Sequence, residues 1–384
     1  MSRIEELIKE KCPDGVEYIL LADATRMQRG TSLTKAKAVE GYIPVISGGK
    51  EPAFYCNTAN RKESVVTVAG SGAGAGYVQY FDSPIFANDC FTLVGKTGVN
   101  TKYVYYFMQS IQKKIYETQK GAGVPHVHIS DIDRFEIPVP PIEVQQEIVR
   151  ILDKFTELEV ELQVELTARK KQYQYYLDDF FDSQTKNLQP LSEIGTLQRG
   201  KRFVHADAVE NDGVACIHYG ELYTYYGIYT NYARSRIREE LRPKMRYAHK
   251  GDVIIVGAGE NNVDIGVGVV WDGEEDVAVH DACYTLKHQQ NPKYISYYLR
   301  SSFYHNQIKR FVSEGKICSI STEGVGRAII PIPSMEEQNR VVRIFDNFDA
   351  ISNDKILGLQ AEIILRHKQY EYYRDLLLTF ERTE

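Results

Sequence analysis

One stretch of this chain occurs twice, and the two copies lie 193 residues apart. Residues 137–155 read Ile-Pro-Val-Pro-Pro-Ile-Glu-Val-Gln-Gln-Glu-Ile-Val-Arg-Ile-Leu-Asp-Lys-Phe, and residues 330–348 read Ile-Pro-Ile-Pro-Ser-Met-Glu-Glu-Gln-Asn-Arg-Val-Val-Arg-Ile-Phe-Asp-Asn-Phe. Each copy continues into a helical pattern that ends in a tyrosine-rich cluster, at residues 173–176 and 370–373. A repeat of this length is too long for a solenoid unit, so it predicts that a whole domain is duplicated.

The helical pattern that follows each copy is long and amphipathic. In the first, Ile148, Leu152, Phe155, Leu158 and Leu162 step by three or four residues, which predicts a coiled-coil seam. The tyrosine clusters are 197 residues apart, so the second helix is expected to carry four extra residues, about one turn. Two such helices, each following an equivalent domain, are predicted to pair antiparallel about a pseudo-twofold axis.

The segments that precede the helices also match. Gln28-Arg-Gly30 returns as Gln198-Arg-Gly200, 170 residues later, and the offset has grown to 193 when Cys90-Phe-Thr-Leu returns as Cys283-Tyr-Thr-Leu. About 23 extra residues are therefore expected in the second unit, and we place them between Arg202 and Asp252. The fold class is predicted as α+β: two globular α/β domains related by a pseudo-twofold axis and separated by two long antiparallel coiled-coil helices. The predicted boundaries are an N-terminal helix over 1–14, domains over 15–140 and 187–333, and helices over 141–186 and 334–384.

The formal net charge of −6 does not exclude a polyanionic partner, because the acidity is unevenly spread. Residues 15–136 hold 13 basic and 11 acidic side chains, and residues 187–330 hold 17 of each. The excess of carboxylates lies on the helices, so the globular parts can still carry local basic patches. The six cysteines form no C-x-x-C pair, and no apolar run reaches membrane-spanning length, so a reduced, cytoplasmic protein without a membrane partner is expected.

Several motifs suggest chemistry, but each has a simpler interpretation. Residues 70–76, Gly-Ser-Gly-Ala-Gly-Ala-Gly, precede a strand-like segment instead of the helix that a dinucleotide site requires, so we expect a hairpin loop. Gly95-Lys-Thr lacks the upstream glycine of a phosphate-binding loop. Asn291-Pro-Lys-Tyr resembles a motif of amino-group DNA methyltransferases, but its repeat partner Asn100-Thr-Lys-Tyr lacks the proline, and a helix N-cap explains both. No metal-binding or catalytic set emerges, and none is predicted.

What remains is a polar, basic loop surface that is built twice. Arginine and lysine can neutralise phosphates or read guanine edges, and tyrosine and serine add contacts to the nucleic-acid backbone. Any one of these side chains is equally well explained as a solvated charge, and only the duplicated loop context favours recognition. The candidate nucleic-acid-binding residues are Gln28, Arg29, Thr31, Lys50, Ser71, Gly72, Lys120, His126 and His128 in the first domain, and Arg199, Lys201, Arg202, Tyr223, Tyr225, Arg234, Lys316 and Ser319 in the second.

The order of these motifs resembles that of the specificity (S) subunits of Type I restriction–modification systems. The resemblance covers essentially the whole chain and rests on the two Gln-Arg-Gly motifs, the two Ile-Pro-x-Pro strand ends, and the two helix openings at 143–149 and 336–342. The second copy departs from the family pattern at Ser334, where proline is usual.

This resemblance implies two target-recognition domains that each read one half of a bipartite, asymmetric double-stranded DNA sequence, with the helices setting the spacer. It implies a chain that is not an enzyme and binds no cofactor itself. Two methylation (M) subunits would use S-adenosylmethionine to methylate adenine N6, and restriction (R) subunits would cleave DNA using ATP and Mg²⁺. The predicted subunit-docking residues are Gln145, Ile148, Leu152, Gln338, Val341 and Phe345.

Two other functions remain open at this point. One is a coiled-coil scaffold whose globular domains bind protein. The other is a stand-alone DNA methyltransferase that uses the glycine-rich loop at residues 70–76.

Overall fold

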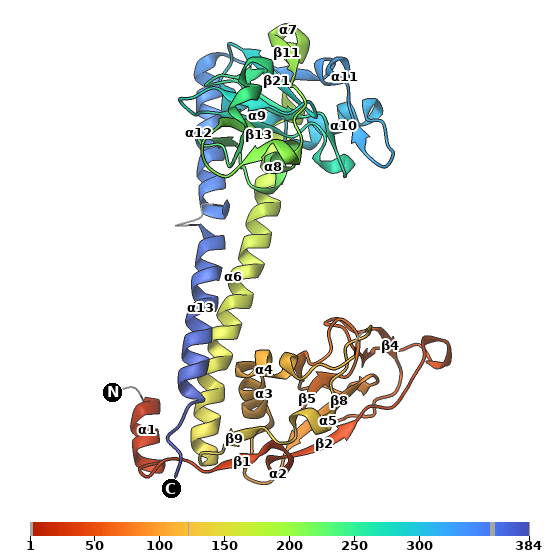
Figure 1. The fold of residues 1–384 in the computed structure, drawn as a ribbon, viewed down its shortest axis with the longest axis vertical. Helices are drawn as coiled ribbons and strands as arrows, with labels where there is room; N and C mark the ends of the chain where they lie inside the picture. Colours follow the sequence, from red (N-terminus) through yellow and green to blue (C-terminus); the bar gives the residue numbers. More distant parts are fainter. Residues whose placement is uncertain (1–2, 122, 354–357, 384) are drawn as a thin grey trace. The chain divides into compact units, whose positions relative to one another are not determined.

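The computed structural model of the chain describes residues 3–121, 123–353 and 358–383 (Figure 1). The chain divides into two compact units: unit 1 consists of Met1–Gln163 and Glu362–Glu384, and unit 2 consists of Val164–Ala361. Each unit therefore combines one globular α/β domain with segments of the long helices. No helix among the described residues is both long and apolar enough to cross a membrane.

The domain of unit 1 is built on small sheets, and most of its strand pairs are antiparallel. One sheet has the order β2-β8-β5-β6, a second has the order β4-β3-β7 with β3 and β7 parallel, and β1 pairs with β9. The strands are β1 (Tyr18–Leu20), β2 (Thr25–Arg29), β3 (Ile43–Ile46), β4 (Phe54–Cys56), β5 (Val65–Ala69), β6 (Val78–Phe81), β7 (Phe86–Ala87), β8 (Cys90–Gly95) and β9 (Glu136–Pro138). The helices of this domain and its N-terminal segment are α1 (Arg3–Lys11), α2 (Leu21–Ala24), α3 (Thr101–Ser110), α4 (Gln112–Glu117) and α5 (Ile129–Ile132).

The glycine-rich stretch at residues 70–76 connects β5 to β6, which pair antiparallel with Val68 opposite Val78. The prediction of a hairpin loop is therefore confirmed. The helical segment that follows Asn100 is divided at Ile111, whose backbone (φ −102°, ψ 14°) leaves the helical region between α3 and α4.

Unit 2 repeats this plan with additional strands. Its two five-stranded sheets have the orders β11-β21-β17-β19-β14 and β12-β15-β13-β20-β16, while β10 pairs with β23 and β18 with β22. The strands are β10 (Leu188–Pro190), β11 (Gly195–Arg199), β12 (Ala208–Val209), β13 (Val214–Ile217), β14 (Tyr229–Thr230), β15 (Ser235–Ile237), β16 (Tyr247–Ala248), β17 (Val253–Val256), β18 (Ala258–Gly259), β19 (Gly268–Trp271), β20 (Val277–Val279), β21 (Cys283–His288), β22 (Cys318–Ser319) and β23 (Ile329–Pro331). Its short helices are α7 (Leu191–Ile194), α8 (Tyr219–Thr224), α9 (Pro292–Tyr298), α10 (Ser302–Ile308) and α11 (Thr322–Gly326).

Strand register shows where the two domains differ in length. Leu93 lies opposite Val66 in unit 1, and its repeat partner Leu286 lies opposite Val253 in unit 2. Val66 and Val253 are 187 positions apart, so most of the 23 extra residues do precede β17, around α8 and β14. The remaining six follow Val253, where the offset grows from 187 to 193, and the placement of all 23 before Asp252 was wrong.

The first long helix, expected over 141–186, is α6 (Ile142–Ser183). The second, expected as a single helix over 334–384, is instead two: α12 (Met335–Asn353) and α13 (Leu359–Leu377). Gly358 and Asn353, which flank the division, both have low helix propensity. The four extra residues fall between Phe348 and Arg366, a stretch that includes residues 354–357, which lie outside the described part of the chain.

Within each unit α6 runs antiparallel to its partner helix. In unit 1 the ring of Phe155 stacks on Tyr373 of α13, and Glu159 meets His367. In unit 2 the ring of Phe345 on α12 contacts both Tyr173 and Phe180 of α6. The predicted seam holds at Ile148 and Leu152, which are fully buried, but Leu158 is 46% exposed. Glu159, one residue further along the helix, takes the position facing α13.

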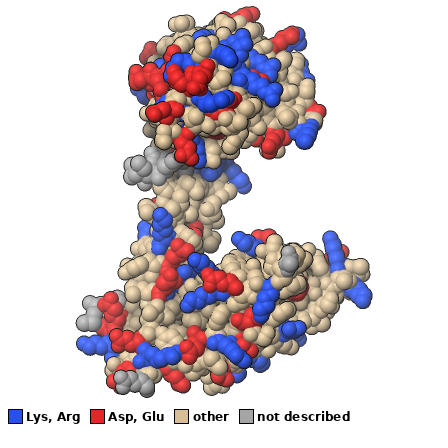
Figure 2. All heavy atoms as spheres, in the orientation of Figure 1, with Lys and Arg blue, Asp and Glu red and all other residues tan. Residues whose placement is uncertain are grey.

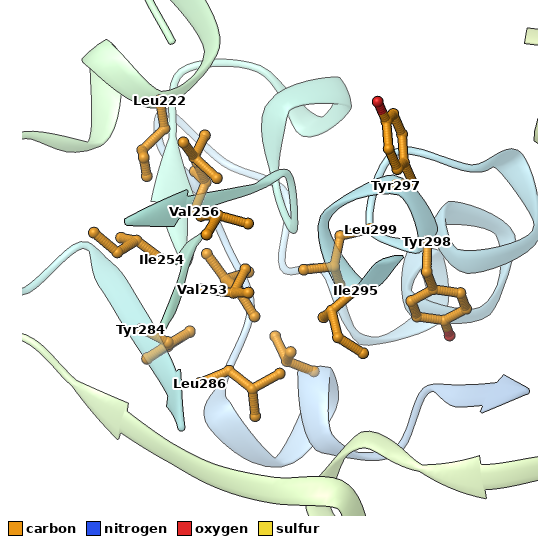
Figure 3. Packing of buried hydrophobic residues seen from close by; sticks show 14 of the residues in the cluster. Leu222, Val253, Ile254, Val256, Tyr284, Leu286, Ile295, Tyr297, Tyr298 and Leu299 are labelled. Atoms are coloured by element: carbon orange, nitrogen blue, oxygen red, sulfur yellow. The ribbon is translucent and has the colours of Figure 1, made fainter. Parts of the chain in front are cut away.

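The larger hydrophobic core of each unit joins the domain to its helices. In unit 2, aliphatic side chains from β17 and β21 pack against α9, as Figure 3 shows for Val253, Leu286 and Ile295. Val341 and Phe345 of α12 belong to this same cluster. In unit 1 the equivalent residues of α6, Ile148 and Leu152, pack with α3. Each domain is thus held on its helix by a continuous apolar core.

Candidate nucleic-acid interface

The two Gln-Arg-Gly motifs end equivalent strands and occupy the same backbone environment. The Gly30 N–H donates to the Cys90 carbonyl at 2.8 Å, and the Gly200 N–H donates to the Cys283 carbonyl at 3.0 Å. A Cβ on Gly30 would lie 2.1 Å from the Asn88 carbonyl oxygen, and one on Gly200 would lie 2.2 Å from that of His280. Only glycine allows this close approach of two backbones, which explains why the glycine is present in both copies.

In each unit, one arginine that the sequence did not single out donates a hydrogen bond to the backbone of the Gln-Arg-Gly motif. In unit 1, Arg61 is buried and donates to the Arg29 carbonyl at 2.8 Å and to Thr92 Oγ1 at 2.8 Å. In unit 2, Arg246 donates to the Arg199 carbonyl at 2.7 Å. The two arginines are 185 positions apart, in the region where the repeat loses its register, so no sequence signal pairs them.

In unit 1, the loops that carry the predicted residues meet around Asn88 and Asp89. The Asn88 amide contacts Ser47 Oγ at 3.3 Å, next to the turn that carries Lys50. Ser71 Oγ donates to the Asp89 carboxylate. The strand end that carries Gln28 and Arg29 joins the same cluster, because the Thr31 N–H donates to the Ala87 carbonyl. We call this set of loops the unit 1 frame: residues 28–31, 47–50, 70–72 and 88–89, with 120–121 and 123–128 joining as described next.

The loop from Lys120 to His128 joins the frame through backbone bonds. Lys120 and His126 exchange backbone hydrogen bonds at 2.8 and 3.0 Å, and the Gly72 N–H donates to the Pro125 carbonyl. The rings of His126 and His128 are stacked with centroids 6.1 Å apart. The structure therefore brings together Lys50, Ser71, Gly72, Lys120, His126 and the strand end carrying Gln28, Arg29 and Thr31, with His128 beside them.

Unit 2 assembles an equivalent frame around His280 and Asp281. The Lys201 N–H donates to the Val279 carbonyl, and the Gly257 and Ala258 N–H groups donate to that of Ala282. Ser319 joins through its β-pairing with Ala258, and Lys316 lies in the exposed loop just before it. We call residues 198–203, 218, 257–259, 280–282 and 316–319 the unit 2 frame.

The groups at the centre of the two frames differ. Where unit 1 has Ser47 and Asn88, unit 2 has His218 and His280, whose ring centroids are 4.5 Å apart. His280 Nδ1 accepts from the Ala282 N–H, so Nε2 carries the proton and donates to the Phe203 carbonyl at 3.1 Å. Burial lowers the pKa of both histidines below the usual value, which favours their neutral forms.

The cations of the frames fall into two classes. Arg199 is held by Asp281, to whose carbonyl its Nε donates at 2.7 Å, and Lys120 pairs with Asp131. By contrast, five exposed cations form no ion pair with any residue that the structure describes: Arg29, Lys50, Lys201, Arg202 and Lys316. The second class can neutralise phosphates without breaking any ion pair in the described structure.

Two predicted residues, Tyr225 and Arg234, lie apart from the unit 2 frame, whereas Tyr223 lies on α8, which packs beside β18 of the frame. Tyr223, Tyr225 and Arg234 belong to the insertion around α8, and the Arg234 guanidinium stacks 3.6 Å from the centre of the Tyr225 ring. Tyr223 and Tyr225 line a cavity of about 1140 Å³ beside α6 and α12. No described contact joins Tyr225 or Arg234 to the Gln-Arg-Gly loop, so the structure does not group them with the other candidates.

The six predicted docking residues are used inside their own units, and their assignment to a docking surface was wrong. Ile148, Leu152, Val341 and Phe345 are core residues with at most 3% exposure. Gln145 and Gln338 are also buried, and each accepts from the backbone N–H of the asparagine that caps the domain helix. The helical periodicity identified a buried helix face correctly, but the domain of the same chain covers that face.

No group of three potential metal-ligating side chains occurs within the described ranges. Burial raises the pKa of the Cys90 thiol and of the Cys216 thiol to about 12, so neither thiol ionises near neutral pH. On the face of unit 2 in view, Figure 2 shows Lys and Arg side chains adjoining one another, with Asp and Glu grouped beside them.

Comparison with known families gives one match that spans most of the chain. The model of the Type I restriction modification DNA specificity domain matches residues 13–169 and again residues 184–363. The two matched segments each contain one globular domain, in agreement with the duplication.

Individual relatives point to the same family. A type I restriction enzyme specificity subunit of Escherichia coli is 29% identical over 414 residues, covering 98% of this chain and 97% of its own length. A putative one of Haemophilus influenzae is 27% identical over 355 residues, covering 89% of both chains. The fold resembles the S subunit of a Type I restriction–modification system from M. genitalium, with a TM-score of 0.57, 16% identity and coverage of 95% and 96%. A chain from a structure of type I restriction–modification complex assembly gives a TM-score of 0.64 at 14% identity, with coverage of 96% and 98%.

Proposed function

The chain belongs to the family of Type I restriction–modification specificity subunits, and we propose that each of its two domains reads one half of a bipartite, asymmetric DNA target. The observation that carries this proposal is the frame built twice from the same backbone contacts, at Gly30 and at Gly200. Each frame presents exposed, unpaired cations, such as Arg29 and Arg202, beside polar groups that can hydrogen-bond to base edges.

The long helices are proposed to set the spacer between the half-sites and to dock two methylation subunits. Exposed apolar side chains on α6, Leu158, Val160 and Val164, support docking there, because large apolar groups in water mark interaction surfaces. Methyl transfer from S-adenosylmethionine and ATP-dependent cleavage are assigned to the methylation and restriction subunits. The role of this chain in that complex is recognition without catalysis.

The direct test is to sequence methylated adenines in host DNA with this chain present and with its gene deleted. The proposal expects one bipartite motif that disappears on deletion. Purified chain with methylation subunits should also bind DNA in a strongly salt-dependent way. Methyl transfer by the purified chain alone would contradict the proposal, and so would the absence of salt-sensitive DNA binding by the assembled complex.

The spacer role can be tested by deleting one helical block, residues 160–163 of α6. Four residues shorten a helix by about 6 Å and turn its far end by only about 40°. We expect both half-sites to persist while the preferred spacer shortens by roughly one or two base pairs, since base pairs are about 3.4 Å apart. Methylation mapping that returns an unchanged spacer would contradict the spacer role.

A further inference from the structure

The contact between each domain and its long helix contains a polar joint that occurs twice. In both units a lysine and a tyrosine, four residues apart on the domain helix, meet one aspartate of the long helix. We call these the unit 1 joint (Lys102, Tyr106 and Asp153) and the unit 2 joint (Lys293, Tyr297 and Asp346).

In the unit 1 joint, Lys102 Nζ donates to Asp153 Oδ2 at 2.8 Å and the Tyr106 hydroxyl donates to Oδ1. Both donors lie on α3, and the carboxylate lies on α6. The Tyr106 ring is fully buried, so the tyrosine cannot turn away from the carboxylate without breaking the core. Lys102 also makes a cation–π contact with the sheet, because its Nζ lies 5.3 Å from the centre of the Tyr80 ring on β6.

The unit 2 joint repeats this arrangement atom for atom. Lys293 Nζ donates to Asp346 Oδ2 at 2.9 Å, and the Tyr297 hydroxyl donates to Oδ1 at 2.7 Å. Figure 3 shows the Tyr297 hydroxyl directed away from the aliphatic cluster of the core. The Nζ of Lys293 lies 4.2 Å from the centre of the Tyr229 ring. Tyr229 belongs to the insertion of unit 2, so two differently built sheets supply the same support to the lysine.

The two joints lie beside an apolar core, and the two kinds of contact constrain motion differently. Apolar side chains tolerate small sliding and repacking, because hydrophobic attraction is non-directional. A carboxylate whose two oxygens each accept from a different, oriented donor tolerates much less, since hydrogen bonds weaken steeply as their angle falls. Burial raises the pKa of Tyr106 and of Tyr297, so each hydroxyl keeps its proton and stays a donor.

We propose that the two joints fix the angle of each recognition domain on its helix, and thereby determine how strictly the protein measures the spacer between half-sites. This rests on the proposed function and names residues for one part of it. The joints act as positioning groups: they lie within the domain–helix core, whereas the bases are read at the frames. Spacer fidelity and base preference should therefore be separable by mutation.

The test uses the complete complex with methylation subunits and a set of duplexes that carry both half-sites at varied spacer lengths. The spacer ratio is the methylation rate at spacers one base pair too long or too short, divided by the rate at the preferred spacer. Asp153→Asn and Asp346→Asn keep the shape of the side chain, and each should raise this ratio about tenfold. A tenfold change corresponds to about 1.4 kcal/mol, within the range for a hydrogen bond to a charged group. The base preference within each half-site should stay unchanged.

Matched controls separate this effect from general destabilisation. Glu157→Gln on α6 and Glu336→Gln on α12 remove exposed carboxylates for which no partner is found among the described residues, and they should leave the ratio unchanged. Lys102→Met should reproduce Asp153→Asn, and the double variant should be no worse than either single one, because both remove the same contact. Thermal unfolding of each variant reports stability independently of the ratio.

Two failures can be told apart. If the wild-type complex is strict and Asp153→Asn and Asp346→Asn remain equally strict, the joints only stabilise the fold and the inference is wrong, whatever happens to the total rate. If the wild-type complex methylates all spacer lengths alike, the spacer role itself fails.

Discussion

The two recognition domains of this chain share a backbone frame but differ in the side chains at its centre. Gly30 and Gly200 meet the same carbonyls, and Arg61 and Arg246 hold the same strand ends. Yet Ser47 and Asn88 of unit 1 are replaced in unit 2 by two histidines. The shared backbone contacts fix the positions of the loops in both domains, whereas the side chains that the loops carry differ. Under the proposed function, this difference is what would let the two domains read different half-sites.

The aspartates at the centre of the two frames, Asp89 and Asp281, also have different partners. Asp89 of unit 1 accepts from Ser71 of the glycine-rich loop, which leaves Arg29 without an ion-pair partner in the described structure. In unit 2, Asp281 is turned to the equivalent arginine, Arg199. A tethered guanidinium loses less side-chain freedom when it binds, so the two arginines should differ in what they contribute.

The largest loss of DNA affinity should follow from replacing the glycine of a Gln-Arg-Gly motif, which both domains share. Gly30→Ala and Gly200→Ala each force a Cβ to within about 2 Å of a backbone carbonyl. Overpacking of this kind costs typically about 1–3 kcal/mol, so affinity should fall by roughly fivefold to more than a hundredfold. The loss should be confined to the half-site of the altered domain, as measured by competition with duplexes scrambled in one half.

Gly227→Ala is a suitable control, because this position lies outside the unit 2 frame and a Cβ there meets nothing within 4 Å. Equal loss at both half-sites from a single frame substitution would show that the frames are not independent.

A smaller effect should separate Arg29 from Arg199. Arg199→Ala should reduce discrimination against a mismatched base in its half-site by about tenfold, the lower part of the range for a well-oriented base contact. Arg29→Ala should reduce it only a few-fold, since its guanidinium is free to move. Asp281→Ala removes the ion pair at 3.8 Å but keeps the carbonyl bond, so it should reduce the contribution of Arg199 part of the way towards that of Arg29. If Asp281→Ala leaves discrimination intact, the ion pair has no part in reading.

The smallest effect should come from pH. A histidine whose pKa is lowered by folding stabilises the fold fully above its unfolded pKa of about 6.5, and this contribution is lost as the pH falls below that value. His218 and His280 are both in this class, and unit 1 has Ser47 and Asn88 in their place. Between about pH 7.5 and 5.5 the half-site of unit 2 should therefore weaken several-fold more than that of unit 1. The double variant His218→Ser and His280→Asn should remove the difference; loss of both half-sites in parallel would contradict the prediction.

The duplication and the hairpin could be predicted because they can be read directly from the order of the residues. The Gln-Arg-Gly motifs were visible for the same reason. Arg61 and Arg246 were not, because the insertion before β17 removes the register that would align them. The error at Gln145 and Gln338 has a different source: periodicity identifies a buried helix face but does not say whether the same chain or a partner covers it. The periodic pattern of residues 334–384 also did not predict that α12 ends at Asn353 or that Gly358 forms a bend before α13.

The most direct test of the central claim is to exchange residues 187–330 for the corresponding domain of another member of the family and map methylated adenines. Two domains that read independently on a common frame predict a motif that keeps the first half-site and the spacer while the second half-site changes to that of the donor. A motif in which both halves change, or in which the original motif persists, would contradict the account.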